Sequence, residues 1–377
     1  MASSRPTVYD VAERAGVSIA TVSYAFRHPD KVRGETRETV LQVARELGYV
    51  PSGSARNLAR GRTGVLGLHL FDLLLDAVPD GALAHDPSAH ESLVDLATLD
   101  LDDGPIAWDE AEDARRSEPQ AFPLYVDEIQ RGFVLECKRN GAAVLLSTGG
   151  SGISDIADTA GRVDGLAILP GRSAASSLAA VGSTLPVVLL SSRAGAGHRV
   201  LADNAAGERM LVEHFVSRHG VQRFGWVGAG LELDPHERMT AFFAEIARCG
   251  PEVTGEVLDA VDIVASPSFD QVLARARAGT LPEALVCATD QTAIALIDAL
   301  RHDGIEVPHD VLVAGFDGIQ ATRMMTPTLT TVRQPMELMG RIAAHLLLTD
   351  PGDGSVAHRT VEVAVGLRIG ESCGCTA

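Results

Sequence analysis

The stretch from Thr7 to Phe26, TVYDVAERAGVSIATVSYAF, constrains the fold of this chain more than any other. Thr7 can cap a helix with Asp10 as its capping-box partner, and Gly16 can end that helix. Ser18 can then cap a second short helix. Apolar residues recur at helical spacing in both segments, namely Val8, Val11, Ala12 and Ala15, then Val22, Ala25 and Phe26. The stretch therefore predicts a helix-turn-helix.

The second of these helices keeps an outward face. A helix in the major groove would present that face to base edges, which makes four residues candidates for base readout: Ile19, Ala20, Ser23 and Tyr24. Hydroxyls, helix-start amides and charge favour phosphate contacts at Thr7, Ser18, Thr21 and Arg27. Two alternatives stay open. Small helical hairpins with two caps also occur without DNA binding, and the Tyr24 ring could pack on the domain's own core.

A third helix is expected from Thr36 to Leu47, with Gly48 closing it. Its apolar residues, Val40, Val43, Ala44 and Leu47, have helical spacing. Residues 1–49 would then form a three-helix DNA-binding domain. Because a core of this size is small, we expect its stability to depend on a dimer or on DNA.

The charge of the chain is unevenly distributed. The formal net charge is −18, yet residues 1–62 hold ten Lys and Arg against six Asp and Glu, whereas residues 72–118 hold fourteen acids against two arginines. The basic end is therefore the candidate nucleic-acid face. The hydrophobic content is 46% without an apolar run long enough for a bilayer, and the N-terminus lacks a secretory signal. These features predict a soluble, cytoplasmic protein.

The five cysteines are scattered, as suits a reducing compartment. Cys373 and Cys375 form a C-terminal C-x-C. A single C-x-C without a second pair or a nearby histidine is a poor metal site, so we expect no metal and a loose tail.

From Val65 onward, buried strands alternate with helices, which predicts two α/β lobes. The expected strands are 64–71, 142–148, 163–170, 185–192, 223–228, 284–290, 310–317 and 360–366. The expected helices are Val126–Lys138, Ser176–Val181, 204–218, 237–248, 270–277, 291–303 and 335–348. Ligands of such folds bind at the carboxyl ends of strands. In the last helix, Met336 and Met339 are core residues by default, with a dimer interface as the alternative.

The motif T-V-x-D-V-A-x-x-A-G-V-S-x-x-T-V-S, beginning at Thr7, resembles the start of lactose-repressor/galactose-repressor (LacI/GalR) family regulators. The resemblance runs from about residue 5 to 370. It implies an N-terminal all-α helix-turn-helix head on an α/β periplasmic-binding-protein type I core of two parallel-sheet lobes. The implied divisions are a head of 1–49, a hinge of 50–63 and a core of 64–377, with lobe 1 at about 64–200 and 333–352 and lobe 2 at about 201–332 and 358–370.

The family resemblance also assigns roles near the DNA. By composition, residues 49–63 are a flexible basic linker, but Y-x-P-x-x-x-A-R-x-L is similar to the family's hinge helix, which binds the minor groove. The resemblance makes Leu58 the apolar wedge between base steps, with groove or phosphate contacts from Arg56, Arg60 and Arg62. Many relatives have Arg where this chain has Tyr24, so we expect the operator to differ at that base.

An acidic block at 73–118 interrupts the resemblance where the family has a short loop after its first core strand. Its composition favours disorder or a loose flap. A lid or a surface for a partner protein is the alternative. Because the replaced loop normally contributes to the effector pocket, that wall of the pocket is in doubt.

The resemblance also implies an effector site. Arg238 matches the family's arginine that binds ligand hydroxyls or a carboxylate, and Asp290 and Asp317 match acids at strand ends. Both acids could instead be helix caps. The chain departs from relatives at Ser192 and Thr289, and Tyr125 and Phe71 are candidates for apolar walls. Asp203 and Asn204 match a D-N pair expected to be mainly structural.

The sequence lacks a Walker A motif, a nucleophile elbow, a complete dinucleotide fingerprint and a metal-spaced His/Cys cluster, so we expect neither enzyme activity nor a cofactor. The prediction is a homodimeric regulator, usually a repressor, that binds a palindromic operator and a small polar effector such as a sugar. Two alternatives remain. One is a regulator with a degenerate pocket controlled by a protein partner, and the other is a stand-alone sugar-binding receptor.

Overall fold

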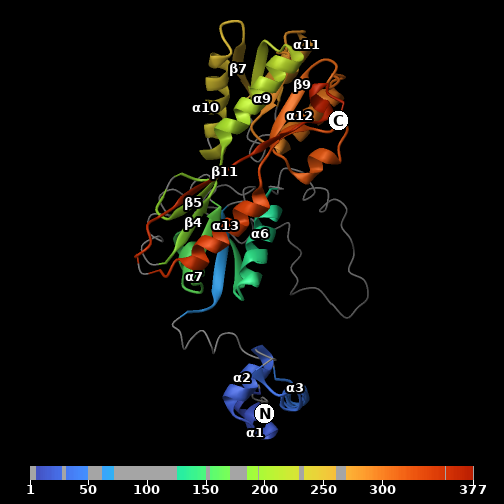
Figure 1. Ribbon diagram of the computed structural model, residues 1–377. Coiled ribbons are helices and arrows are strands. Elements are labelled where there is room, and N and C mark those ends of the chain that lie inside the picture. The colour runs from blue at the N-terminus through green and yellow to red at the C-terminus, as the bar shows by residue number, and fades with distance from the viewer. Residues whose placement is uncertain are drawn as a thin grey trace, which may run out of the picture. The chain divides into compact units, whose positions relative to one another are not determined.

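The computed structural model divides into two compact units, Met1–Gly64 and Val65–Ala377, which are described separately (Figure 1). The residues described are 6–27, 31–49, 62–71, 125–149, 153–169, 185–193, 195–228, 233–259, 269–352 and 354–376. Several predictions lie outside these residues: the hinge contacts of Arg56, Leu58 and Arg60, the helix at 176–181 and the acidic block at 73–118.

The first unit is a three-helix domain of α1 (Val8–Ala15), α2 (Ile19–Arg27) and α3 (Gly34–Leu47). The Thr7 amide and hydroxyl both donate to the Asp10 carboxylate, at 2.6 and 2.7 Å. Gly16 and Gly48 end α1 and α3 in the left-handed conformation, with φ of 65° and 68°. The predicted caps are therefore confirmed. Helix α3 begins two residues before the predicted Thr36, because its N-cap is Arg33.

The core of this domain is made by the expected apolar residues. Val11, Val22 and Val40 are fully buried, and Phe26 packs edge-on against Tyr49 with ring centroids 6.1 Å apart. The remaining buried members are Ala12, Ala25, Val43 and Ala44. This small core fixes the angle between α1 and α2 and so determines which residues of α2 remain outside.

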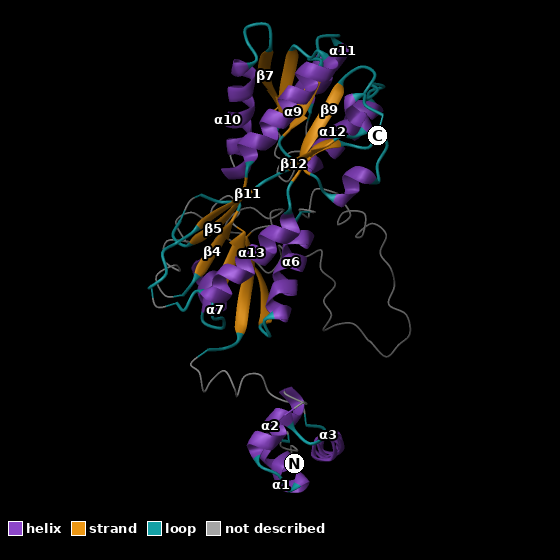
Figure 2. Cartoon of the chain, in the orientation of Figure 1, coloured by secondary structure: helices purple, strands orange, loops and turns teal. Residues whose placement is uncertain are grey.

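The second unit holds two six-stranded sheets in separate lobes (Figure 2). The first sheet has the order β11-β5-β4-β3-β1-β2 and is parallel throughout. Its strands are β1 (Val65–Phe71), β2 (Ala143–Gly149), β3 (Leu166–Leu169), β4 (Val187–Leu190), β5 (His198–Ala202) and β11 (Thr360–Val363).

The second sheet has the order β12-β10-β9-β8-β6-β7, and only β12 is antiparallel to its neighbour. Its strands are β6 (Arg223–Val227), β7 (Thr254–Asp259), β8 (Ala284–Cys287), β9 (Leu312–Asp317), β10 (Thr330–Arg333) and β12 (Gly366–Arg368). The chain crosses between the lobes after β5, after β10 and after β11.

Helices cover both sheets. In the first lobe these are α6 (Val126–Arg139), α7 (Ile153–Ala160) and α13 (Met336–Thr349). In the second lobe they are α9 (Asn204–His219), α10 (Leu233–Arg248), α11 (Asp270–Arg277) and α12 (Asp290–His302). Short 3-10 turns η3 (Gln320–Arg323) and η4 (Glu371–Cys373) follow β9 and β12. Among the described residues, no helix has the length and apolar character that crossing a membrane requires.

The structure corrects some sequence-based expectations. Residues 360–363 were assigned to lobe 2, but β11 pairs in parallel with β5 in the first sheet, so the last crossover comes after β11. Strands β5, β7, β10 and β12 and helix α7 were not predicted, because their short segments mix polar and charged residues with apolar ones. Met336 and Met339, with 1% and 0% exposure, lie in the chain's own core rather than at a dimer surface.

Helices α6 and α13 approach each other at paired glycines. A Cβ on Gly132 would lie 1.9 Å from the carbonyl oxygen of Glu337, and a Cβ on Gly340 would lie 2.1 Å from that of Ile129. Arg131 and Glu337 add an ion pair at 2.9 Å between the same helices. The two backbones are thus in contact, without side chains between them.

Gly340→Ala is therefore expected to lower the free energy of unfolding of the core by about 1–3 kcal/mol, because the added methyl group must push two helices apart. Urea denaturation of the full chain measures this. Gly366→Ala is the matched control, since its Cβ would meet nothing within 4 Å. Equal stability of the two variants would contradict the close packing.

Candidate DNA-binding face and effector site

The outward face of α2 carries the residues expected to meet base edges. Ile19 and Tyr24 are 42% and 46% exposed, Ala20 is exposed and Ser23 is half-buried. The Ser18 hydroxyl accepts the Thr21 amide at 3.1 Å and so fixes the first turn of α2. Because Tyr24 lies half outside, its ring is not part of the domain core. The base and phosphate contacts themselves, including that of Arg27, stay predictions.

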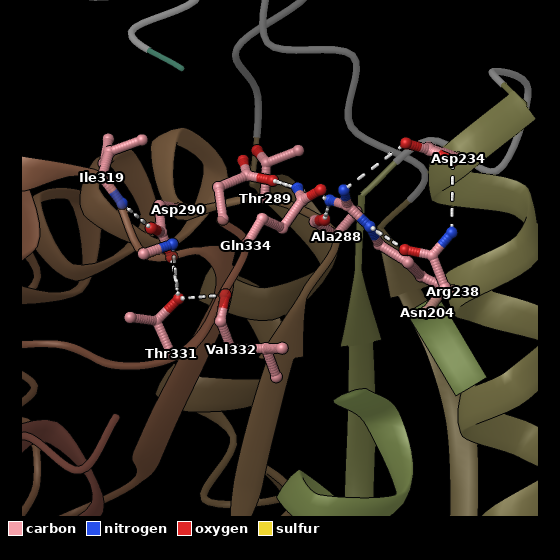
Figure 3. A network of polar contacts seen from close by, with 12 residues as sticks. Asn204, Asp234, Arg238, Ala288, Thr289, Asp290, Ile319, Thr331, Val332 and Gln334 are labelled. Atoms are coloured by element: carbon pink, nitrogen blue, oxygen red, sulfur yellow. Dashed lines mark hydrogen bonds and ion pairs between the residues drawn. The ribbon is translucent and has the colours of Figure 1, made fainter. Parts of the chain in front are cut away.

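Arg238 of α10 lies at the centre of a polar network at the carboxyl ends of the second sheet's strands (Figure 3). Its guanidinium donates to the Ala288 carbonyl at 2.7 Å and to Asn204 Oδ1 at 3.2 Å. It pairs with Asp317 at 3.1 Å and with Asp234 at 3.8 Å, and lies 3.9 Å from the centre of the Phe316 ring. The cation is 3% exposed, so the chain itself provides its partners.

Burial alone would lower the pKa of Arg238, but three carboxylates more than offset that effect and raise it. These are Asp317, Asp234 and Glu208. In return, the Asp234 carboxyl has a pKa raised by burial, with Arg238 opposing the shift. One buried cation therefore holds several buried acids together, as charge pairing in a low-dielectric site requires.

Asp317 ends β9 with a φ of 123°, a conformation that residues with side chains rarely adopt. Its Oδ1 accepts from Gln334 Nε2 at 2.6 Å as well as from Arg238. Burial raises the pKa of Asp317 to about 6, although Arg238 lowers it. Gln334 comes from the crossover after β10, so this acid also links the strand end to a connection between the lobes.

Asp290 was expected either to bind ligand or to cap α12, and the structure gives the cap to its neighbour. The Thr289 hydroxyl accepts the Thr292 amide at 3.2 Å, whereas the Asp290 carboxylate accepts from the Ile319 amide at 2.9 Å and from Thr331 Oγ1 at 2.5 Å (Figure 3). Burial, and then the charge of Asp317, raise the pKa of Asp290 to about 7. Asp290 thus fixes the turn after β9.

Glu208 of α9 is a site residue that the sequence did not predict. It is 0% exposed, and neither carboxylate oxygen has a hydrogen-bond partner within the described part of the chain. Burial raises the pKa of Glu208 to about 8, with Arg238 opposing the shift. At neutral pH this carboxyl is mostly protonated. Of the buried acids in the network, it has the fewest hydrogen-bond partners in the described part of the chain.

The other predicted effector residues lie in the first lobe. Ser192 follows β4 and is 1% exposed, and Tyr125 precedes α6 and is half-buried. The side chain of Phe71 lies outside the described residues. Asp203 caps α9 through the Ala206 amide at 2.8 Å, as expected. Asn204 is in addition part of the polar network, because it donates to Asp234 and Glu237 and accepts from Arg238.

Ion pairs join the two lobes beside this network. Arg333 of β10 binds the Glu128 carboxylate of α6 through both terminal nitrogens, one of them at 3.0 Å. Arg193, after β4, pairs with Glu237 of α10 at 2.8 Å. These ion pairs were not predicted from the sequence, because a single sequence does not show which distant segments come into contact. These pairs hold the two lobes in the arrangement of this structure.

The C-terminal C-G-C is not the loose tail that was expected. Ser372 Oγ donates to the Val313 carbonyl at 2.6 Å and accepts the Thr330 amide at 2.9 Å. Glu371 accepts the Thr328 amide at 2.9 Å, and Cys373 is 0% exposed. These bonds fix the segment on the second sheet, and two histidines of α9 lie beside it.

A capped helix-turn-helix with an exposed face on its second helix, followed by two α/β lobes with a polar site at strand ends, defines a ligand-responsive DNA-binding regulator. Residues 7–52 match the model for bacterial regulatory proteins of the lacI family, and residues 212–373 match that for a periplasmic binding protein-like domain. The chain belongs to the lacI family and is a sequence-specific transcriptional regulator rather than an enzyme.

Characterised relatives cover nearly the whole chain. The chain is 27% identical over 349 residues to the ribose operon repressor of Halalkalibacterium halodurans, covering 91% of this chain and 89% of that one. It is 27% identical over 356 residues to the transcriptional repressor CytR of Escherichia coli K12, with the same shares. A crystal structure of the lac repressor dimer bound to operator and an anti-inducer superposes with a TM-score of 0.71 at 23% identity, covering 98% and 99%. The fold predicted from the sequence is thus confirmed.

Proposed function

We propose that the protein is a cytoplasmic, homodimeric repressor that binds a palindromic operator and responds to a small polar effector. The observation that carries the DNA part is the outward α2 face, with Ile19, Ala20 and Tyr24 exposed and Ser23 half-buried, on a head that matches the lacI family. Relatives named as repressors, and a lac repressor dimer bound to operator, support the same assignment.

The effector part rests on the network around Arg238. A guanidinium and several acids at strand ends suit a ligand with hydroxyl groups, because both kinds of group form directional hydrogen bonds in a buried site. Neighbours with bound cellobiose and bound ribose support a sugar or a similar metabolite. A ligand that prefers one arrangement of the lobes would shift the Arg333–Glu128 and Arg193–Glu237 pairs and so change operator affinity.

One observation favours a second candidate. The Arg238 side chain already contacts Ala288, Asn204, Asp317 and Asp234, so an effector would have to compete with these partners. A regulator whose own residues fill the pocket, controlled by a protein partner, also fits this arrangement. A thermal-stability screen with sugars and nucleosides separates the two candidates, because only a pocket that binds ligand gives a rise in melting temperature that grows with ligand concentration.

Selection of bound sites from random DNA by the full-length protein tests the DNA-binding proposal. Enrichment of a palindrome supports a dimer that reads two equivalent half-sites. If no sequence is enriched, with or without added metabolites, the head does not read DNA and the proposal is wrong.

Tyr24→Ala is expected to weaken binding to the selected site by about 1–3 kcal/mol and to relax the preference at one base position in each half-site. Non-specific binding should change little, because no charge is lost. Titrations on the selected site and on scrambled DNA measure both. Tyr24→Phe keeps the ring and separates its contribution from that of the hydroxyl. An equal loss on both DNAs would exclude base readout by this residue.

A further inference from the structure

Four side chains with metal-binding atoms converge where α9 meets the C-terminal turn. They are His214 and His219 of α9 together with Cys373 and Cys375, and their ligand atoms all lie within 4.8 Å of one another. The histidines lie in the last turns of α9, and the cysteines belong to a segment more than 150 residues later in the chain. The C-terminus lies in the second lobe, as Figure 1 marks.

Four of the six distances among these ligand atoms are close to those around a single tetrahedral ion. The two histidine Nε2 atoms are 3.3 Å apart, and Cys375 Sγ lies 3.4 Å from His219 Nε2 and 3.8 Å from His214 Nε2. Cys373 Sγ lies 3.5 Å from His214 Nε2. Zinc with bonds of about 2.3 Å to sulfur and 2.0–2.1 Å to nitrogen separates two nitrogens by about 3.3 Å and sulfur from nitrogen by about 3.6 Å.

Hydrogen bonds of the chain itself fix both segments that carry these ligands. Asp203 caps the first turn of α9, and Gly220, with a φ of 66°, ends the helix directly after His219. Hydrogen bonds of Glu371 and Ser372 to Thr328, Thr330 and Val313 fix the turn that carries the cysteines. A site with prearranged ligands loses little conformational entropy when it binds metal, which favours tight binding.

We propose that His214, His219, Cys373 and Cys375 bind one Zn²⁺ ion that fastens the C-terminal turn to the end of α9. Two thiolates and two imidazoles at tetrahedral spacing are the donor set of closed structural zinc sites. The ion completes four-coordination with protein ligands and leaves no open position, so its role is structural. Because α9 also carries Asn204 and Glu208 of the polar network, the site holds the far end of the helix that lines it.

The test is the metal content of the full-length protein purified without chelators, measured by plasma mass spectrometry. About one zinc per chain is expected in the wild type, and at least about a ten-fold loss in the C373S/C375S double variant. Cys249→Ser is the matched control, because Cys249 is an exposed cysteine outside the cluster, and it should keep its zinc. The H214Q/H219Q variant gives a second, independent removal, and circular dichroism shows whether each variant is folded.

Cobalt provides a readout on the unmodified chain. Metal-free wild type titrated with Co²⁺ should develop the visible bands of a tetrahedral ion and the thiolate-to-cobalt band, and Zn²⁺ should bleach both. Removing zinc with a chelator should lower the melting temperature of the wild type but not of a folded double variant.

Four results would overturn the proposal. One is a folded wild-type protein that takes up neither zinc nor cobalt, and another is zinc that persists in both ligand variants. The third is a Cys373–Cys375 disulfide in protein alkylated at the moment of cell lysis. Copper at equal stoichiometry in place of zinc would also refute the assignment of the ion.

Discussion

Arg238→Met is expected to lower the free energy of unfolding of the core by about 3–5 kcal/mol at pH 8. The substitution leaves Asp317 and Asp234 buried without the cation that pairs with them at 3.1 and 3.8 Å. It also removes the donor to the Ala288 carbonyl and the cation over Phe316. Methionine keeps much of the volume, so the loss reports charge and hydrogen bonding rather than a cavity.

The loss should depend on pH. In the wild type, the folded pKa of Asp317 is about 6, above its ordinary value of 3.8, and removing Arg238 raises it further. A carboxyl with a raised folded pKa costs stability as pH rises from its unfolded to its folded pKa. The difference between variant and wild type should therefore grow from pH 5 to pH 8 and shrink in acid.

Urea denaturation at pH 5 and pH 8 measures both effects. Arg277→Met is the control, because Arg277 is 66% exposed in its pair with Asp303, and water and salt screen the attraction in such a surface pair. A loss at Arg238 no greater than at Arg277 would show that the network is not held by this cation. Arg238→Lys keeps the charge but lacks the planar guanidinium group. If this variant is folded and its melting temperature no longer rises with effector, that result supports a role of Arg238 in ligand binding.

Local chemistry made the head predictable from sequence. Thr7, Asp10 and Gly16 act through neighbours within a few residues, and the helical spacing of Val11 and Val22 is the pattern of one buried face. The buried strands of the core were predictable for the same reason, since continuous apolar runs such as Val187–Leu190 have few alternatives. A segment such as Thr330–Arg333 contains polar and charged residues, and it forms a strand because of its partners in the sheet.

The candidate site was predictable in part. Arg238, Asp290 and Asp317 were named from motifs, and the structure brings them to neighbouring strand ends. Which group each acid binds depends on tertiary packing. Thr289 therefore caps α12, whereas the Asp290 carboxylate accepts a hydrogen bond from the turn after β9. The His–Cys cluster was missed because the C-x-C was interpreted as a poor metal site without a histidine nearby in the sequence. Its two histidines, His214 and His219, lie more than 150 residues earlier, and only the fold brings them to the cysteines.

Glu208 is a fully buried acid whose ionisation should strongly affect stability. Its folded pKa is about 8 against an ordinary 4.5, and burial is the main cause. Below pH 4.5 the carboxyl is neutral in both the folded and the unfolded chain and costs nothing electrostatically. Between pH 4.5 and 8 the folded chain binds a proton that the unfolded chain has released, so the stability of the wild type falls as pH rises.

Glu208→Gln should therefore stabilise the core at pH 9, by about 5 kcal/mol if the full shift is lost, and should have little effect near pH 4.5. The amide keeps the shape of the side chain but cannot ionise. Denaturation of wild type and variant across this pH range gives the difference curve, which should rise through the window and level off above pH 8. Glu213→Gln, an exposed site on the same helix, is the control and should give a flat curve.

The same experiment bears on the pocket. If an effector supplies the hydrogen-bond donor that Glu208 lacks in the described part of the chain, the ligand should bind the ionised carboxylate and lower its pKa. Ligand binding would then release a proton near pH 7, which calorimetry in two buffers of different ionisation enthalpy detects. The E208Q variant should bind without proton release. A flat difference curve for E208Q would mean that the carboxyl is solvated, and it would remove the basis for this linkage.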